Sequence, residues 1–228
     1  NIKFVCGPLG GGESLPNGLK DYAKGHEIIE VVRSGINRWY RFKLRITGKL
    51  NRCDYIMFAN KETQDFLGLD ENFPLVTEIA ADEISIEKRT ISNDINDERV
   101  FLFAGRMVYR KGLELLFDAI MEIPDEWKYI VKIVGDGPDF LHLKHRCESN
   151  SLLSAHVQFM GAVQYSEMQR EYELSDVLIM PSIRETTGTV LIEAMSQGMP
   201  VITINKFGGA ILVDENTGWL YNGENRKS

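Results

Sequence analysis

Two carboxylates flank a short run of small residues in the C-terminal half of the chain. Glu185 and Glu193 are separated by seven residues, and Gly188, Thr189 and Val190 stand between them. The surrounding apolar pattern predicts a strand, a loop and the start of a helix. The unpaired N–H groups of a helix N-terminus attract a phosphate, and both carboxylates can face the same cleft. Taken alone, a loop glutamate and a surface helix glutamate would also explain the pair.

Two cations follow an earlier strand-like segment. Arg106 and Lys111 lie in a loop that begins at Gly105 and leads into a helix, so both can point at one anion. Glycines also follow the next two strands, at Gly135 and at Gly161-Ala162. Each feature is a weak signal by itself. Together they describe a cleft that suits a nucleoside diphosphate bearing a polyhydroxylated group, with cations and amides on the diphosphate and carboxylates on vicinal hydroxyls.

The sequence lacks two motifs that would indicate other chemistry. No D-x-D motif occurs, so we expect no metal ion on the diphosphate, and Arg106 and Lys111 would have to neutralise the leaving group. No cofactor is expected, because the nucleotide-linked ligand would itself be the substrate. No strand is followed by G-x-G-x-x-G, which argues against a dinucleotide dehydrogenase.

From residue 100 onward, strand-like and helix-like segments alternate. This alternation predicts an α/β domain with a parallel sheet and helices on both faces. Ligands bind such sheets beyond the carboxyl ends of the strands, and the loops that carry the candidate residues lie at those ends. The expected strands are 100–104, 129–134, 157–159, 176–180, 200–204 and 218–221, and the expected helices are 112–123, 140–150, 166–174 and the helix of Glu193.

The preceding residues predict a partial N-terminal α/β domain. Its first strand runs into the segment G-P-L-G-G-G-E, whose three glycines allow a ligand to approach the backbone closely but equally fit a bare flexible loop. A second strand and a short helix follow further on. The expected bounds are 2–6 and 54–59 for the strands, 61–67 for the helix, 1–82 for this domain, 83–98 for an acidic linker and 99–228 for the C-terminal domain.

Residues 31–53 concentrate positive charge in an acidic chain. They hold seven basic residues and no acidic one, whereas the whole chain has a net charge of −7, which argues against nucleic-acid binding. Trp39, Phe42, Ile46 and Leu50 recur at helical spacing beside the basic residues. Such a helix can lie on an anionic membrane surface. It can equally face the core and expose a solvated basic flank.

The composition is that of a globular protein. The 228 residues are 43% hydrophobic and 26% charged, and no apolar run approaches the roughly 18 residues of a membrane span. Three scattered cysteines are typical of reduced, buried thiols in the cytosol. The N-terminus lacks an initiator Met and a signal-peptide pattern. We therefore interpret the chain as part of a longer protein that is cytoplasmic or peripheral on the inner membrane face.

Four segments, in this order, carry a family resemblance: F-A-G-R-M-V-Y-R-K-G, V-G-D-G-P, F-M-G-A-V and P-S-I-R-E-T-T-G-T-V-L-I-E-A-M-S-Q-G-M-P-V-I. They resemble the C-terminal domain of retaining glycosyltransferases of family 4, also called glycosyl transferases group 1. The resemblance covers about residues 100–221. It implies the GT-B fold, in which two Rossmann-like domains face each other and the second binds the sugar nucleotide. Residues 1–80 more loosely resemble the latter part of the N-terminal domain in bacterial polysaccharide-type members.

The resemblance also implies residue roles, with two departures. It implies diphosphate binding by Arg106 and Lys111, donor-sugar contact by Glu185, ribose binding by Glu193, phosphate contact by the amides of Gly188–Val190 and base contact near Gly161-Ala162. Where many relatives have E-x-F-G, this chain has Glu185-Thr186-Thr187-Gly188, without the aromatic ring. The Gly208-Gly209 loop lacks the glutamate that is common there. The first departure removes an aromatic ring beside the donor, and the second leaves one donor contact unassigned.

The resemblance implies a metal-independent retaining hexosyltransferase. The donor would be a nucleotide sugar, which we expect to be UDP-linked, and the acceptor a saccharide or a polyprenyl-linked saccharide of a bacterial surface polysaccharide. No catalytic base is assigned, and His26 fits a turn residue equally well. Two alternatives stay open: a UDP-sugar epimerase on the same fold, and a non-catalytic fragment that binds nucleotide sugars.

Overall fold

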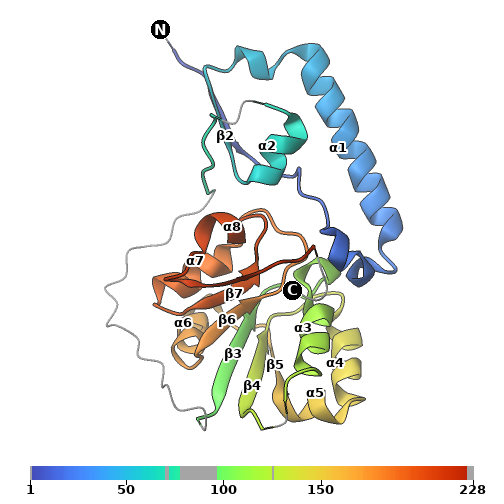
Figure 1. The fold of residues 1–228 in the computed structure, drawn as a ribbon, viewed down its shortest axis with the longest axis vertical. Helices are drawn as coiled ribbons and strands as arrows, with labels where there is room; N and C mark the ends of the chain where they lie inside the picture. The colour runs from blue at the N-terminus through green and yellow to red at the C-terminus, as the bar shows by residue number, and fades with distance from the viewer. Residues whose placement is uncertain (1, 70–71, 78–96, 125, 225–228) are drawn as a thin grey trace.

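The molecule consists of a larger C-terminal unit and a smaller N-terminal unit (Figure 1). The computed structural model describes residues 2–69, 72–77, 97–124 and 126–224. The predicted linker, 83–98, lies almost wholly outside the described residues. The domain boundary at residue 82 therefore stays a prediction.

A six-stranded parallel sheet forms the centre of the C-terminal unit. Its strands are ordered β5-β4-β3-β6-β7-β8, so the direction of winding reverses between β3 and β6. In open α/β sheets this reversal is where ligands bind. The predicted parallel sheet is confirmed, with strand ends that differ from the prediction by two residues at most. The bounds are β3 Arg99–Ala104, β4 Tyr129–Val134, β5 Val157–Gly161, β6 Val177–Met180, β7 Val201–Ile204 and β8 Gly218–Tyr221.

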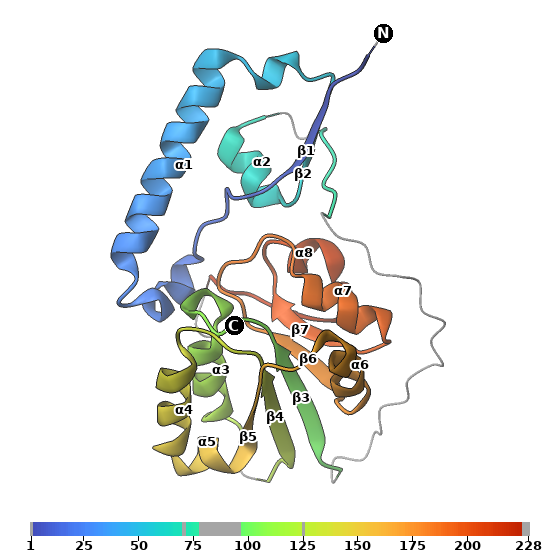
Figure 2. The ribbon, with the colours of Figure 1, turned by 180° about the vertical axis from the view of Figure 1, so that it is seen from behind.

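Helices cover both faces of this sheet (Figures 1 and 2). Successive residues of β3 point to opposite faces: Leu102 joins one buried apolar cluster and Phe103 joins the other. Each face therefore has its own core, one under α3 to α5 and one under α6 to α8. The bounds are α3 Leu113–Ile120, α4 Phe140–Glu148, α5 Ser151–His156, α6 Tyr165–Glu173, α7 Thr189–Ser196 and α8 Gly209–Leu212, with a single 3-10 turn, η3, at Tyr109–Lys111.

Three predicted helices have different limits in the structure, and the one expected over 112–123 is α3, which ends at Ile120. The helix expected over 140–150 ends at Glu148, because the side chain of Asn150 accepts hydrogen bonds from the backbone of Leu152 and Leu153, both at 3.0 Å, and so starts a new helix. Ser166 does not cap the next helix. Gln164 does, in a capping box with Glu167.

The N-terminal unit has a two-stranded parallel sheet. The strand expected over 2–6 lies instead at β1, Val5–Leu9, paired with β2, Tyr55–Phe58. Gly7 lies within this strand and comes very close to β2, since a Cβ there would lie 2.4 Å from the carbonyl oxygen of Met57. Only a glycine fits at this position. The remaining elements are η1 Asn17–Ala23, α1 Glu27–Thr47, η2 Leu50–Arg52 and α2 Lys61–Leu67.

Helix α1 has an unusual orientation. None of its residues is buried, and Trp39, Phe42 and Ile46 are 56%, 62% and 69% exposed. The interpretation of this stripe as a core face is therefore wrong. The less exposed side of the helix is mainly polar and includes Glu30 and Arg33. Among the three thiols, Cys147 is buried as expected, but Cys6 and Cys53 are only half-buried.

Candidate functional site

The loops at the carboxyl edge of the sheet pack against one another through glycines. Gly112, with φ +74°, lies so close to the β6–α7 loop that a Cβ would stand 2.0 Å from the carbonyl oxygen of Pro181. A Cβ at Gly208 would likewise stand 1.8 Å from the carbonyl oxygen of Thr187. No side chain fits at these positions. The loops after β3, β6 and β7 are therefore held together where the winding reverses.

Lys111 and Glu185 form an ion pair in this cluster of loops. The Lys111 ammonium donates a hydrogen bond to Glu185 Oε2, and the two side chains are only 14% and 13% exposed. Arg110 Nη1 lies 3.9 Å from the same oxygen. The sequence argument missed Arg110, although its basic side chain stands beside Lys111 in the same loop. The pair is well shielded from water, so its attraction is stronger than that of a surface pair.

Arg106 lies in the same loop, but its side chain is neither shielded nor paired with any described residue. Its side chain is exposed, and no hydrogen bond or ion pair engages it within the described part of the chain. A diphosphate could therefore bind Arg106 without displacing a protein carboxylate, whereas it would have to share Lys111 with Glu185. Gly105, which precedes Arg106, has φ +154° and lets the chain leave β3 in this direction.

Glu193 lies in the second turn of α7, as expected. Its Oε2 accepts a hydrogen bond of 2.7 Å from the hydroxyl of Tyr172 on α6. Burial raises the pKa of Tyr172 well above its usual value, and the bond to Glu193 raises it further, so Tyr172 stays a donor. Tyr172 thus fixes the direction of the Glu193 carboxylate. The sequence argument missed Tyr172, because 21 residues separate the two.

The N-terminus of α7 and the end of β5 present backbone groups. Gly188 occupies the N-cap position of α7 with φ +82°, and no side chain caps the helix. No described side chain therefore occupies the first N–H groups of the helix, including those of Thr189 and Val190, and their use as an anion site stays a prediction. At the end of β5, Gly161 has φ +71°, and a Cβ there would have no atom within 4 Å. The backbone of Gly161 and Ala162 thus borders open space.

The G-P-L-G-G-G-E segment is fixed by its glutamate. Glu13 is buried, and its Oε1 accepts hydrogen bonds from Gly11 N at 3.0 Å and Asn60 Nδ2 at 2.6 Å. Asn60 Nδ2 also lies 3.1 Å from the carbonyl oxygen of Thr186. The segment is therefore tied to the residue that follows Glu185. The interpretation as a bare flexible loop is wrong, and no local sequence pattern indicates this contact.

A second link joins α1 to the same loop. Glu30 accepts hydrogen bonds from the Tyr109 hydroxyl and from Arg184, and Arg33 Nε lies 3.3 Å from its other oxygen. Burial alone would raise the pKa of Glu30, but the bond from Tyr109 and the charges of Arg184 and Arg33 outweigh burial and lower it. His26, which from the sequence fits a turn residue and a catalytic base equally well, lies at the N-cap position of α1 and stacks on the Tyr109 ring, with centroids 4.0 Å apart.

No metal-binding cluster is evident in the ranges that the structure describes. There, no three His, Cys, Asp or Glu side chains gather as ligands. The independence of the chemistry from metal stays a prediction. The roles assigned to Arg106, Lys111, Glu185 and Glu193 also stay predictions, although the structure places the first three in neighbouring loops at one edge of the sheet.

Comparison with known proteins identifies the class of this chain. The family description "Glycosyl transferases group 1" matches residues 85–228. The uncharacterized glycosyltransferase MJ1607 of Methanocaldococcus jannaschii is 32% identical over 129 residues, which are 55% of this chain and 33% of that protein.

Two solved structures share the fold over most of this chain. The lipopolysaccharide outer core galactosyltransferase WaaB in its apo form has a TM-score of 0.65 at 21% identity, covering 76% of this chain and 50% of its own. HepE of Anabaena in complex with UDP has a TM-score of 0.62 at 20% identity, and the match covers 80% of this chain and 54% of HepE. The present chain thus spans about a third to a half of the length of these proteins. It belongs to the glycosyl transferases group 1 family and has the GT-B glycosyltransferase fold, with a Rossmann-like C-terminal unit and a partial N-terminal unit.

Proposed function

We propose that this chain carries the donor site of a metal-independent, retaining hexosyltransferase of family 4 that uses a UDP-sugar. The observation that carries the proposal is the exposed Arg106 beside the Lys111–Glu185 pair, where the winding of the sheet reverses. Family membership supports sugar transfer. HepE, a structural neighbour solved with UDP, supports this choice of nucleotide.

The proposed chemistry begins with departure of the nucleoside diphosphate. The bond from the anomeric carbon to the phosphate oxygen breaks, and its electron pair stays on the β-phosphate. Arg106 and Lys111 stabilise that charge, and one such donor is worth about 3–4 kcal/mol once the bound donor excludes water. Glu185 holds Lys111 in place and accepts hydrogen bonds from the sugar. The acceptor oxygen bonds to the anomeric carbon from the face that the leaving group vacates and gives its proton to the departing phosphate oxygen, so the anomeric configuration is retained.

The other predicted residues hold the nucleotide. Glu193, oriented by Tyr172, accepts both vicinal ribose hydroxyls. The first N–H groups of α7, from Gly188 to Val190, bind the phosphate, and the backbone at Gly161-Ala162 contacts the base. We assign no catalytic base among the described side chains.

A transfer assay with UDP-glucose and a simple saccharide acceptor separates this proposal from its alternatives. The products are followed by proton NMR. A new glycoside with the anomeric configuration of the donor supports retention. An inverted glycoside contradicts it. A UDP-hexose isomer without transfer indicates an epimerase, and UDP binding without any reaction indicates a non-catalytic fragment.

We further propose that the acceptor is a saccharide or polyprenyl-linked saccharide of a bacterial surface polysaccharide, reached at the inner membrane face. Among the fold neighbours, WaaB is a galactosyltransferase of the lipopolysaccharide outer core, and this supports the proposal. Helix α1 supports a membrane contact, because Trp39, Phe42 and Ile46 are exposed and Arg38, Lys43 and Arg45 flank them. No helix in the described ranges is long and apolar enough to cross a membrane.

Co-flotation with vesicles tests the membrane contact. We expect the chain to float with phosphatidylglycerol vesicles and not with phosphatidylcholine vesicles, and to be released by high salt. Trp39→Ser should weaken the association. Trp127→Ser is the matched control, since Trp127 is also about half exposed, at 51%, but lies in the C-terminal unit. Equal flotation of both variants and the wild type would exclude α1 as the contact.

A further inference from the structure

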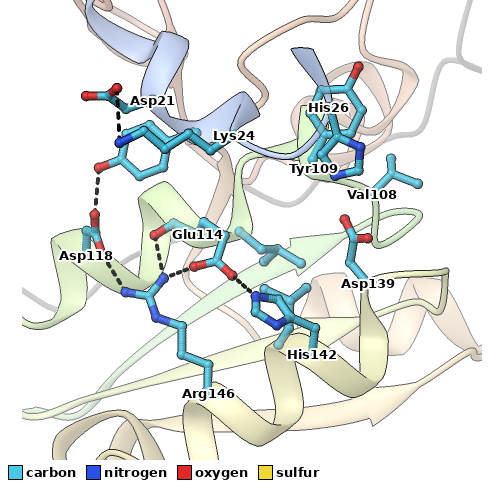
Figure 3. Close-up of a pocket in the computed structure, with 13 residues that line it drawn as sticks. Asp21, Lys24, His26, Val108, Tyr109, Glu114, Asp118, Asp139, His142 and Arg146 are labelled. Atoms are coloured by element: carbon cyan, nitrogen blue, oxygen red, sulfur yellow. Dashed lines mark hydrogen bonds and ion pairs between the residues drawn. The ribbon is translucent and has the colours of Figure 1, made fainter. Parts of the chain in front are cut away.

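A cavity of about 530 Å³ lies beside the donor loops, between the N-terminal unit and helices α3 and α4 (Figure 3). One side is lined by Asp21, Tyr22, Lys24 and His26, with Tyr109 stacked on His26, and the opposite side is lined by Glu114, Asp139 and His142. The lining does not include Arg106, Lys111, Glu185 or Glu193. The cavity is therefore separate from the donor site proposed above.

One side of the cavity is a fixed network of charges. Arg146 binds the carboxylates of Glu114 and Asp118, the hydroxyl of Tyr22 donates to Asp118 at 2.8 Å, and His142 Nε2 lies 2.9 Å from Glu114 (Figure 3). The positive charge of Arg146 is thus used by two carboxylates. Because Tyr22 comes from η1, this network also holds the N-terminal wall in place.

Asp139 supplies a carboxylate that the protein does not use. It occupies the N-cap position of α4, where an aspartate usually accepts a hydrogen bond from the first turn, yet it makes no such bond. Within the described ranges, only the backbone of Asp139 is hydrogen-bonded, and no hydrogen bond or ion pair engages its carboxylate. In Figure 3 the carboxylate points away from α4 toward the stacked rings of His26 and Tyr109. A free acceptor therefore stands beside a flat aromatic wall.

The charges of the cavity decide between classes of ligand. Its lining holds four carboxylates against Lys24 and Arg146, which disfavours a nucleotide or any other phosphate. Carboxylates accept pairs of hydrogen bonds from vicinal hydroxyls, and an aromatic wall packs against the apolar face of a sugar ring. A volume of about 530 Å³ lies in the range of small-molecule sites, roughly 300–1,000 Å³.

We propose that this cavity is a subsite for a neutral or amino sugar residue of the acceptor saccharide. This inference rests on the proposed transferase function. Tyr109 lines the cavity and Lys111 binds Glu185, and both belong to the single turn η3. A saccharide anchored here therefore lies one turn away from the place where the donor would react.

Saturation-transfer NMR with three probes tests the subsite: methyl α-D-glucopyranoside, N-acetylglucosamine and glucosamine. We expect at least one probe to bind, and to stay bound when UDP is present. The double variant Asp139→Asn/His142→Ala should weaken that binding roughly tenfold. It should fold normally, because the His142 side chain is 73% exposed and Asp139 makes no cap bond. Lys144→Ala on the same helix is the control, since Lys144 does not line the cavity.

Calorimetry with UDP on the same variants separates this inference from the function on which it rests. UDP affinity should be unchanged in the double variant. Three results would overturn the subsite: no binding of any probe, displacement of the bound probe by UDP, or equal binding by the double variant and the control. If UDP does not bind at all, the proposed function fails, while loss of a probe signal in the double variant would still support a sugar site.

Discussion

The two units of the molecule are stabilised by different kinds of contact. The C-terminal unit has an apolar core on each face of its sheet, with Leu102 and Phe103 at most 1% exposed. The N-terminal unit has two paired strands and a long helix, α1, with no buried residue. A two-stranded sheet is marginal by itself. Part of its order therefore comes from contact with the C-terminal unit, through Leu19, which belongs to one buried cluster with Ile183, Ile204 and Phe207, and through the Glu13 and Glu30 networks.

This difference has a functional consequence. Both networks end on residues that neighbour Glu185, namely Arg184 and Thr186. The C-terminal unit thus supplies the donor residues, while the N-terminal unit helps to fix the loop that carries one of them. We expect the two units to respond differently to the same kind of substitution.

Glycine-to-alanine substitutions should give the largest contrast. Gly112→Ala places a Cβ 2.0 Å from the Pro181 carbonyl oxygen at a positive φ, so it should lower the free energy of unfolding by about 2–4 kcal/mol. Gly35→Ala in α1 meets no atom within 4 Å and should be neutral or stabilise the helix by up to about 1 kcal/mol. Urea unfolding of both variants measures the difference. Equal losses would contradict the account of the loop packing.

Breaking the Glu30 network should have an intermediate effect. Glu30→Gln removes the charge that Arg184 and Arg33 face, and should lower the free energy of unfolding by about 1–3 kcal/mol. Limited proteolysis should then cut the N-terminal unit faster, while the C-terminal unit keeps its resistance. Glu27→Gln is a control on the same helix turn, because Glu27 is exposed. A variant as resistant as the control would show that the network does not hold the units together.

The same network should make stability depend on pH. The pKa of Glu30 is lower in the folded chain than its usual value, so the unfolded chain binds more protons and stability rises with pH. The contribution is complete above the ordinary carboxyl pKa of about 4.3 and is lost as the pH falls toward the folded pKa. Over this range, the free energy of unfolding should rise more steeply with pH in the wild type than in Glu30→Gln. The same pH dependence in both proteins would contradict the lowered pKa of Glu30.

The smallest effect on stability is expected on the outer face of α1. Trp39→Ser changes a side chain that is 56% exposed and should alter the free energy of unfolding by less than about 0.5 kcal/mol. Thermal unfolding measures this change. A larger loss would mean that Trp39 packs against the protein, which would remove the basis for a membrane contact.

The sheet could be predicted from the sequence because its signals are local. Apolar runs and helical spacing gave β4 and β8 with their observed bounds, and the ends of the strands placed Arg106, Lys111 and Glu185 at one edge. The partners of these residues could not be predicted. Glu30 and Arg184 are 154 residues apart, and no local pattern encodes such a contact. Periodicity likewise revealed the apolar stripe of α1 but not that it is exposed.

The central claim is that Arg106 and Glu193 belong to one nucleotide site. Calorimetric titration of the 228-residue chain with UDP, without metal, tests it most directly. We predict binding that Arg106→Ala and Glu193→Ala each weaken by about tenfold or more, while Arg38→Ala in α1 leaves it unchanged. If UDP does not bind, or if it binds equally well to all three variants, the assignment of this site is wrong.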